Sequence, residues 1–272
     1  GWGGCETCSD VFSTEQGRQE FATSVKEVLV KYQADGIDID WESPVLGGFK
    51  GHKATPADKQ NFTSLIITLR KTLFKKHEIC FDANSFKEFI NKSIEWNKVM
   101  PHVDFVNLMT YGLPTDKRGH TGHHTALYSS SYQQESIDKA ITYFDSLKVP
   151  LNKLLIGAAF YSFVVKEVDS LNNGLGQLGK FKANVNYKIL LDEYPKEKGY
   201  SYHWDSIAMA PFLYNAELKE FVTYDDKRSV AAKTNYALNK KLGGIMFWRI
   251  NGDTYSDGLL DAIDNQIKTN KK

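Results

Sequence analysis

The sequence has little that would direct it to a membrane or to nucleic acid. No apolar run approaches the roughly 18 residues that a helix needs to cross a bilayer. With 34 basic and 33 acidic side chains, the chain lacks the basic excess of a nucleic-acid-binding surface. Apolar residues make up 42% and charged residues 25%, a balance that disfavours disorder. We therefore expect a globular protein without a membrane span and without a nucleic-acid partner.

Cysteine is also scarce, which limits metal binding. Cys5 and Cys8 form a lone Cys-x-x-Cys pair, whereas a structural zinc site needs about four ligands. A loop disulfide and a reduced pair both stay open for these two residues. Cys80 lies in the apolar run Ile79-Cys80-Phe81 and is predicted to be a buried core thiol. No metal and no cofactor is predicted.

Apolar periodicity predicts alternating helices and strands. The expected helices cover residues 13–32, 55–73, 86–99, 137–144, 229–242 and 257–267. The expected strands cover residues 36–42, 79–83, 105–111, 154–161 and 245–248. Residues 162–222 interrupt this pattern and indicate an insertion with its own small structure. Such alternation is typical of parallel strands, so either the sheet is open or the start of an eight-stranded barrel is missing.

The strongest functional signal is Asp35-Gly36-Ile37-Asp38-Ile39-Asp40-Trp41-Glu42. Alternate side chains of a strand share a face, so the apolar residues should point towards covering helices. Asp38, Asp40 and Glu42 should then form a row with steps of roughly 6–7 Å. Like charges this close raise one another's pKa, which suits a general acid near neutral pH. A hydrogen-bonded row without chemistry and an oxygen-ligand site for Mg²⁺ or Ca²⁺ are the alternatives.

This segment resembles the catalytic signature of glycoside hydrolase family 18, the chitinase-type (β/α)8 barrels, where it lies on strand four. Further segments resemble family motifs in the same order along the chain. They are residues 1–2 for the end of strand three, 107–111 for strand six, 157–161 for strand seven, 221–226 with Ser229 for the last helix before strand eight, and 243–248 for strand eight. The resemblance implies that residues 1–272 are an α/β TIM barrel of the chitinase type, with residues 162–222 as a small α+β insertion after strand seven.

The same resemblance implies that strands one to three are largely missing from the chain. The sequence opens Gly1-Trp2-Gly3-Gly4 without an initiator Met or a signal peptide, so a preceding segment is expected to have been removed or left out. A barrel without its first strands has unpaired edges. We therefore expect a C-shaped, aggregation-prone and nearly inactive fragment of an active, monomeric full-length protein.

Roles for individual residues follow from the resemblance. Glu42 would protonate the leaving oxygen and then act as base on water, while Asp40 would hold the 2-acetamido group of the substrate. Asp38 would share a proton with Asp40, and Tyr111 would bind the acetamido oxygen. The implied sugar-contacting residues are Trp2, Met109, Tyr161 and Trp248. The crowded histidines His120, His123 and His124 are expected to pack the loop rather than to bind metal.

The implied activity is retaining hydrolysis of β-1,4-linked N-acetylglucosamine polymers, chitin or chitooligosaccharides, assisted by the substrate's own acetamido group. An endo-β-N-acetylglucosaminidase of N-glycan cores would use the same acids, although Trp41 favours a chitinase. A non-catalytic chitin- or glycan-binding lectin would share the barrel, although Glu42 favours an enzyme. Because the substrate is an extracellular polymer, a secreted, cell-surface or periplasmic location is expected.

Overall fold

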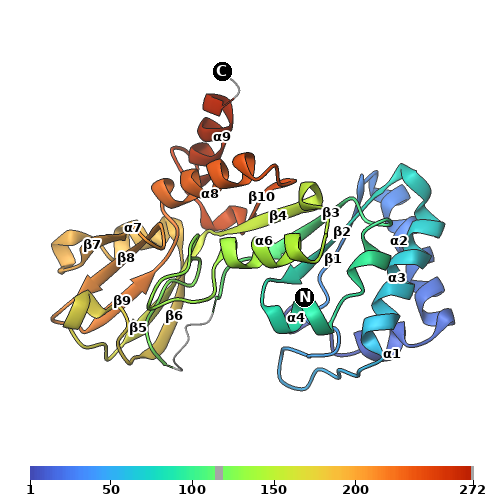
Figure 1. Ribbon diagram of the computed structural model, residues 1–272, viewed down its shortest axis with the longest axis horizontal. Coiled ribbons are helices and arrows are strands. Elements are labelled where there is room, and N and C mark those ends of the chain that lie inside the picture. Colours follow the sequence, from blue (N-terminus) through green and yellow to red (C-terminus); the bar gives the residue numbers. More distant parts are fainter. Residues whose placement is uncertain (114–118, 271–272) are drawn as a thin grey trace. The chain divides into compact units, whose positions relative to one another are not determined.

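The computed structural model describes residues 1–113 and 119–270 (Figure 1). The chain divides into two compact units. The first comprises Gly1–Met109 and Tyr143–Leu155, and the second comprises Thr110–Thr142 and Ile156–Lys272. Across the described residues, no helix is both long enough and apolar enough to cross a membrane.

The first unit is built on the parallel strands β1 (Gly36–Ile39), β2 (Glu78–Asn84) and β3 (Phe105–Met109). β2 lies in the middle, pairing with β1 on one side and with β3 on the other. The helices of this unit are α1 (Cys8–Phe12), α2 (Glu15–Tyr32), α3 (Asp58–Leu73), α4 (Lys87–Lys92) and α5 (Trp96–Val99), with the 3-10 turns η1 (Phe74–Lys76) and η2 (Leu151–Lys153). The predicted parallel pairing is therefore confirmed for these strands.

Helix α2 follows the periodicity of the sequence. It begins after Thr14, whose side chain accepts a hydrogen bond from the backbone N–H of Gly17 at 3.0 Å. Ala22, Val25 and Leu29 recur at helical spacing and are buried. α2 lies against α3, and both helices flank the strands of the unit (Figure 1). The helix predicted at residues 13–32 is confirmed.

Aromatic rings form a continuous core in the first unit. Trp41 meets Phe12 at 5.3 Å and Phe62 at 6.2 Å between ring centroids. Phe62 meets Phe81 at 5.0 Å, and Phe81 meets Trp96 at 6.0 Å. Burying a large apolar side chain stabilises a fold by about 1.5–3 kcal/mol. The core therefore holds the segment after β1 firmly against α1 and α3.

The single helix predicted at residues 86–99 is wrong. α4 ends at Lys92 and α5 begins at Trp96. The indole N–H of Trp96 donates to the carbonyl of Ile90 at 2.7 Å. In a continuous helix that carbonyl would accept from the N–H of Ile94. The buried indole thus takes the acceptor that the helix needs to continue.

The start predicted for the next helix also differs. α3 begins at Asp58 rather than directly after Thr55. The backbone N–H and the hydroxyl of Thr55 donate to the carboxylate of Asp58 at 2.8 and 2.9 Å. This closes a turn in front of the helix. Asp58 is fully buried and also accepts a hydrogen bond from Ser9 at 2.7 Å, which ties α3 to α1.

The second unit contains an antiparallel sheet with the strand order β6-β5-β9-β8-β7. Its strands are β5 (Tyr161–Lys166), β6 (Lys180–Asn186), β7 (Ser201–Asp205), β8 (Ala210–Asn215) and β9 (Glu220–Thr223). Helix α7 (Tyr187–Glu193) and the 3-10 turns η3 (Leu171–Gly174) and η4 (Lys196–Lys198) accompany it. The small α+β insertion predicted at residues 162–222 is present as this antiparallel sheet with helix α7, and its first strand begins at Tyr161.

The remaining elements are α6 (Ile137–Ser146), β4 (Leu154–Ala159), α8 (Lys227–Asn239), β10 (Gly244–Trp248), the 3-10 turn η5 (Ile250–Gly252) and α9 (Leu259–Asn270). β4 and β10 are neighbours in one sheet.

The strand predicted at residues 154–161 divides at Phe160. The backbone N–H of Phe160 donates to the carbonyl of Trp248 at 2.8 Å, and the carbonyl of Phe160 accepts from the backbone N–H of Tyr187 at 3.0 Å. These two bonds mark the point where the chain leaves β4 for β5.

The structure is an α/β fold whose strands β1, β2, β3, β4 and β10 match the five strands predicted from the sequence. That strands one to three of a barrel are missing, and that the barrel is therefore open, stays a prediction. The same holds for the division of the chain into one barrel domain with an insertion.

A buried ion pair stabilises the second unit. The ammonium group of Lys233 lies 2.7 and 2.6 Å from the two carboxylate oxygens of Asp225, and both side chains are fully buried. Asp225 also accepts hydrogen bonds from the backbone N–H of Ala159 at 2.9 Å and from the hydroxyl of Ser229 at 2.6 Å. The pair therefore joins α8 to the end of β4.

Replacing Lys233 by methionine is expected to lower the free energy of unfolding by about 3–5 kcal/mol, because it leaves the Asp225 carboxylate buried without its cation. Urea unfolding followed by circular dichroism measures this loss. Lys240→Met is the matched control: Lys240 is on the surface, 3.9 Å from Asp138, and its loss should cost no more than about 0.5 kcal/mol. Equal unfolding free energies for the two variants would contradict the expectation.

Candidate active site

The end of β1 positions the predicted carboxylates. Asp38 lies within the strand, Asp40 is the first residue after it, and Glu42 follows two residues later. Ile39 and Trp41, which alternate with them, are only 6% and 4% exposed because they face the core. The alternation predicted from the sequence is confirmed, although the regular strand ends at Ile39 rather than at residue 42.

Side chains of β2 and β3 face the same row. The strand register pairs Asp38 with Cys80, and it pairs Asp82 with Asn107. The Asn107 amide donates a hydrogen bond to the Asp38 carboxylate at 3.2 Å. Cys80 is half-buried, and its thiol donates to the carbonyl of Ile37 at 3.5 Å. The prediction of a core thiol is wrong, because the pleat of β2 turns Cys80 to the carboxylate face.

Burial and like charge raise the pKa values of the row. Burial, and after it the charge of Asp40, raises the pKa of Glu42 to about 7. Burial also raises the pKa of Asp38, although Asp38 keeps access to solvent. For Asp82, burial followed by the charges of Asp38 and Asp40 raises the pKa to about 8. Glu42 and Asp82 therefore both hold protons at pH 6, which is the state that a general acid needs.

Asp82 was not identified from the sequence. The segment Cys80-Phe81-Asp82-Ala83-Asn84 alternates polar and apolar residues, as the segment before Glu42 does. Phe81 and Ala83 are fully buried, so the polar residues share the opposite face. This shorter alternation is the sequence feature that could have indicated Asp82. It indicates a site residue only together with the pairing of β2 with β1, which places the polar face of β2 beside Asp38.

Trp2 lies beside Glu42. Its backbone N–H faces the Glu42 carboxylate and opposes the rise of the Glu42 pKa. The indole is 63% exposed and meets Phe49 edge to face at 5.8 Å. A Cβ atom on Gly48 would lie 2.9 Å from the indole and 2.7 Å from the Glu42 carbonyl oxygen, closer than atoms tolerate. Glycine at this position lets the loop pass and leaves the indole face open next to Glu42.

Other predicted site residues belong to the second unit. The rings of Tyr111 and Tyr161 meet edge to face at 5.9 Å. The Tyr111 hydroxyl lies 4.0 Å from the sulfur of Met246 on β10. Trp248 ends β10, and its side chain is 54% exposed. Met109, the last residue of β3, belongs instead to the first unit and is 9% exposed. The structure thus brings Tyr111, Tyr161 and Met246 together in the second unit, and it groups Trp2 with the carboxylates in the first.

The loop histidines and the N-terminal cysteines have structural contacts. His123 lies 3.0 Å from the Asp205 carboxylate, and His124 stacks on Phe163 at 4.5 Å between centroids. Burial lowers the pKa of His124 to about 3, so its ring is neutral. Cys5 and Cys8, whose state was left open, form a disulfide bond. In the part of the chain that the structure describes, no three His, Cys, Asp or Glu side chains are placed to hold a metal ion.

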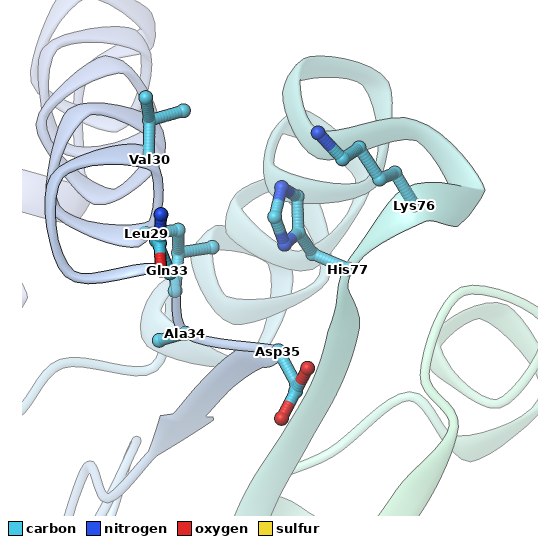
Figure 2. Close-up of a pocket in the computed structure, with 7 residues that line it drawn as sticks. All are labelled: Leu29, Val30, Gln33, Ala34, Asp35, Lys76 and His77. Atoms are coloured by element: carbon cyan, nitrogen blue, oxygen red, sulfur yellow. The ribbon is translucent and has the colours of Figure 1, made fainter.

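A pocket of ≈ 320 Å³ opens at the other end of the strands (Figure 2). It is lined by Leu29, Val30, Gln33, Ala34, Asp35, Lys76 and His77. These residues precede β1 and β2 or belong to the end of α2, whereas Asp40 and Glu42 follow β1. In parallel α/β barrels the chemistry lies at the carboxyl ends of the strands. We therefore assign the candidate active site to the carboxylate row and not to this pocket.

Known proteins resemble the chain along almost its whole length. A sequence model of the glycosyl hydrolases family 18 matches residues 1–253. Chitinase A1 of Niallia circulans is 32% identical over 277 residues, which cover 93% of this chain and 40% of that protein. The first three curated relatives are all longer, and the chain spans between 40% and 57% of their length.

Solved structures give the same relationship. A family 18 N-acetylglucosaminidase from Paenibacillus barengoltzii is 34% identical and superposes with a TM-score of 0.86, covering 95% of this chain and 78% of that one. A chitinase from Bacillus thuringiensis is 28% identical with a TM-score of 0.92, covering 99% of this chain and 49% of that one. The α/β fold predicted from the strand and helix pattern is therefore shared with these proteins.

The proton on Glu42 predicts how stability changes with pH. Because folding raises the Glu42 pKa to about 7, the folded state keeps a proton that the unfolded state loses above its ordinary pKa. This contribution is complete below the unfolded pKa and disappears as the pH rises through 7. Glu42→Gln should therefore weaken the fall in unfolding free energy between pH 5 and pH 8, as measured by urea unfolding. Glu27→Gln, which changes an exposed carboxylate on α2, should keep the original slope. Identical slopes for both variants would contradict this.

Proposed function

Because the chain belongs to the glycosyl hydrolases of family 18, we propose that it hydrolyses β-1,4-linked N-acetylglucosamine polymers, chitin or chitooligosaccharides, with retention of configuration. The observation that carries this proposal is the row formed by Asp38, Asp40 and Glu42, with a proton on Glu42 near neutral pH. The chitinases among the relatives support chitin as the substrate class. Such a polymer lies outside cells, so we also propose a secreted, cell-surface or periplasmic location.

Glu42 is the proposed general acid. Its proton passes to the glycosidic oxygen as the bond between that oxygen and the anomeric carbon breaks, and the bonding electrons stay on the oxygen. The resulting Glu42 carboxylate then takes a proton from the attacking water. A pKa of about 7 allows both steps near neutral pH, since the group is protonated before the first step and basic enough for the second. The exposed face of Trp2 beside Glu42 suits contact with the leaving sugar.

Asp40 is the proposed partner of the substrate's acetamido group. In this family the acetamido oxygen itself attacks the anomeric carbon, so the protein needs no carboxylate nucleophile. Asp40, which lies between Asp38 and Glu42 in the row, accepts the acetamido N–H, and its charge stabilises the positive oxazolinium intermediate. Asp38 shares a proton with Asp40 before the substrate arrives. Tyr111 is proposed to donate to the acetamido oxygen.

Aromatic side chains and one methionine are the proposed contacts to the sugar rings. By family resemblance, sugar rings contact Trp2, Met109, Tyr161 and Trp248. The 54% exposed side chain of Trp248 supports this role, because an open indole face can stack on a sugar. Met109 is mostly buried and contributes at most a small contact.

Release of single N-acetylglucosamine units is a second candidate function. It is favoured by the 34% identical N-acetylglucosaminidase from Paenibacillus barengoltzii. Product analysis on chitooligosaccharides of two to six sugars distinguishes release of single sugars from internal cleavage. A high-mannose glycopeptide in the same assay tests cleavage of N-glycan cores, and binding without any turnover would indicate a lectin.

Replacing Glu42 by glutamine is expected to lower kcat by about 10²–10⁴-fold while substrate binding is kept, because the amide cannot supply the proton. Steady-state kinetics on a chitooligosaccharide at pH 6 measure the loss. Glu78→Gln is the matched control, since Glu78 is an exposed carboxylate at the start of β2. A kcat for Glu42→Gln within tenfold of the unsubstituted protein would rule out the proposed acid.

Removal of the acetamido group from the substrate should abolish turnover by the unsubstituted protein. Without that group no oxygen is available to attack the anomeric carbon, and the row offers no nucleophile in its place. Chitosan oligosaccharides that are fully deacetylated, compared with acetylated ones of equal length, test this by reducing-end release. Efficient cleavage of the deacetylated series would show a different mechanism.

A further inference from the structure

β2 brings a fourth carboxyl group to the row. Asp82 is half-buried and forms a hydrogen bond with Asp38. The Asn107 amide on β3 donates to Asp38 at 3.2 Å, and Asn107 lies opposite Asp82 in the strand pairing. Strand register fixes this arrangement, because Asp82 lies opposite Asn107 and Asp38 lies opposite Cys80. Asp38 is therefore contacted by Asp82 from β2 and by Asn107 from β3 on the carboxylate face.

A hydrogen bond between two carboxyl groups requires a proton, since two carboxylates offer only acceptors. The titratable groups facing Asp82 are Asp38, Asp40 and Glu42 from β1 and the residues after it, and Cys80 from β2. β3 contributes the neutral amide of Asn107. Burial, and then the charges of Asp38 and Asp40, raise the pKa of Asp82 to about 8. The proton therefore belongs to Asp82, and Asp38 accepts from it.

We propose that Asp82 is a positioning residue for the hydrolysis, which donates a hydrogen bond to Asp38 and keeps Asp38 an oriented anion when Asp40 turns to the substrate. This rests on the proposed function. In the proposed mechanism, Asp38 and Asp40 share a proton before substrate binds. When Asp40 turns to the acetamido group, Asp38 loses that partner, and the hydrogen bonds from Asp82 and Asn107 remain. Without them the Asp38 carboxylate, whose pKa is already raised by burial and by the charge of Asp40, would lose the hydrogen bonds that favour its charged form, which disfavours the turn.

Two variants of Asp82 separate this role from packing. Asp82→Asn removes the titrating group but keeps an N–H that can donate to Asp38, whereas Asp82→Ala removes the donor altogether. At pH 6 we expect Asp82→Ala to lower kcat on a chitooligosaccharide by about tenfold, with a smaller change in KM. Asp82→Asn should retain more of kcat than Asp82→Ala. Urea unfolding of both variants confirms that the assayed protein is folded, and Glu78→Gln on the same strand serves as the unchanged control.

A spectroscopic readout tests the proton without relying on activity. In protein labelled with ¹³C at aspartate carboxyl carbons, one resonance should titrate near pH 8 and should be absent from Asp82→Asn. No aspartate resonance titrating between pH 7 and 9 would overturn the proposal, and so would equal losses of kcat in Asp82→Ala and Asp82→Asn. An active Glu42→Gln variant would instead overturn the proposed function, while the aspartate titration would still report on Asp82.

Discussion

Crowding of like charges at the carboxyl end of parallel strands is the constraint on which the site depends. Asp38, Asp40, Glu42 and Asp82 share one face, partly shielded from water, so their simultaneous ionisation is unfavourable. Glu42 and Asp82 therefore keep their protons at a higher pH than ordinary carboxyl groups do. Those protons make Glu42 an acid and allow hydrogen bonds between groups that would otherwise repel each other. The chemistry of the site is thus a consequence of where the fold places its charges.

The same strand that carries the carboxylates also carries part of the core. Ile39 and Trp41 alternate with the acids, and Trp41 packs between Phe12 and Phe62. The cost of holding acids together is offset by apolar burial on the other face of the same short segment. Since each acid is covalently next to a buried residue, close packing fixes the position of its backbone.

A buried carboxylate elsewhere in the molecule is stabilised by a cation rather than by a proton. Asp225 is fully buried, yet it faces Lys233 and accepts hydrogen bonds from Ala159 and Ser229. Its charge is compensated within hydrogen-bonding distance, so it supports the fold. In the carboxylate row, Asp38 receives the neutral amide of Asn107 at 3.2 Å, and the N-terminal ammonium of Gly1 lies 3.8 Å from Asp40. Close compensation makes the Asp225 charge part of the fold, whereas burial and like charge leave raised pKa values on the acids that the proposed reaction uses.

The sequence by itself determined the elements that depend on local periodicity. The alternation around Asp38, Asp40 and Glu42, the helical stripe of α2 and the insertion at residues 162–222 are all visible along the chain, because each reflects neighbouring residues. Tertiary structure alone decided that Asp82, Cys80 and Asn107 join the row, since strand register pairs residues that are distant in sequence. It also decided the break between α4 and α5, where the Trp96 indole captures a backbone carbonyl. Periodicity alone does not identify such long-range pairings, because they depend on which strand and which ring lie opposite one another in the folded chain.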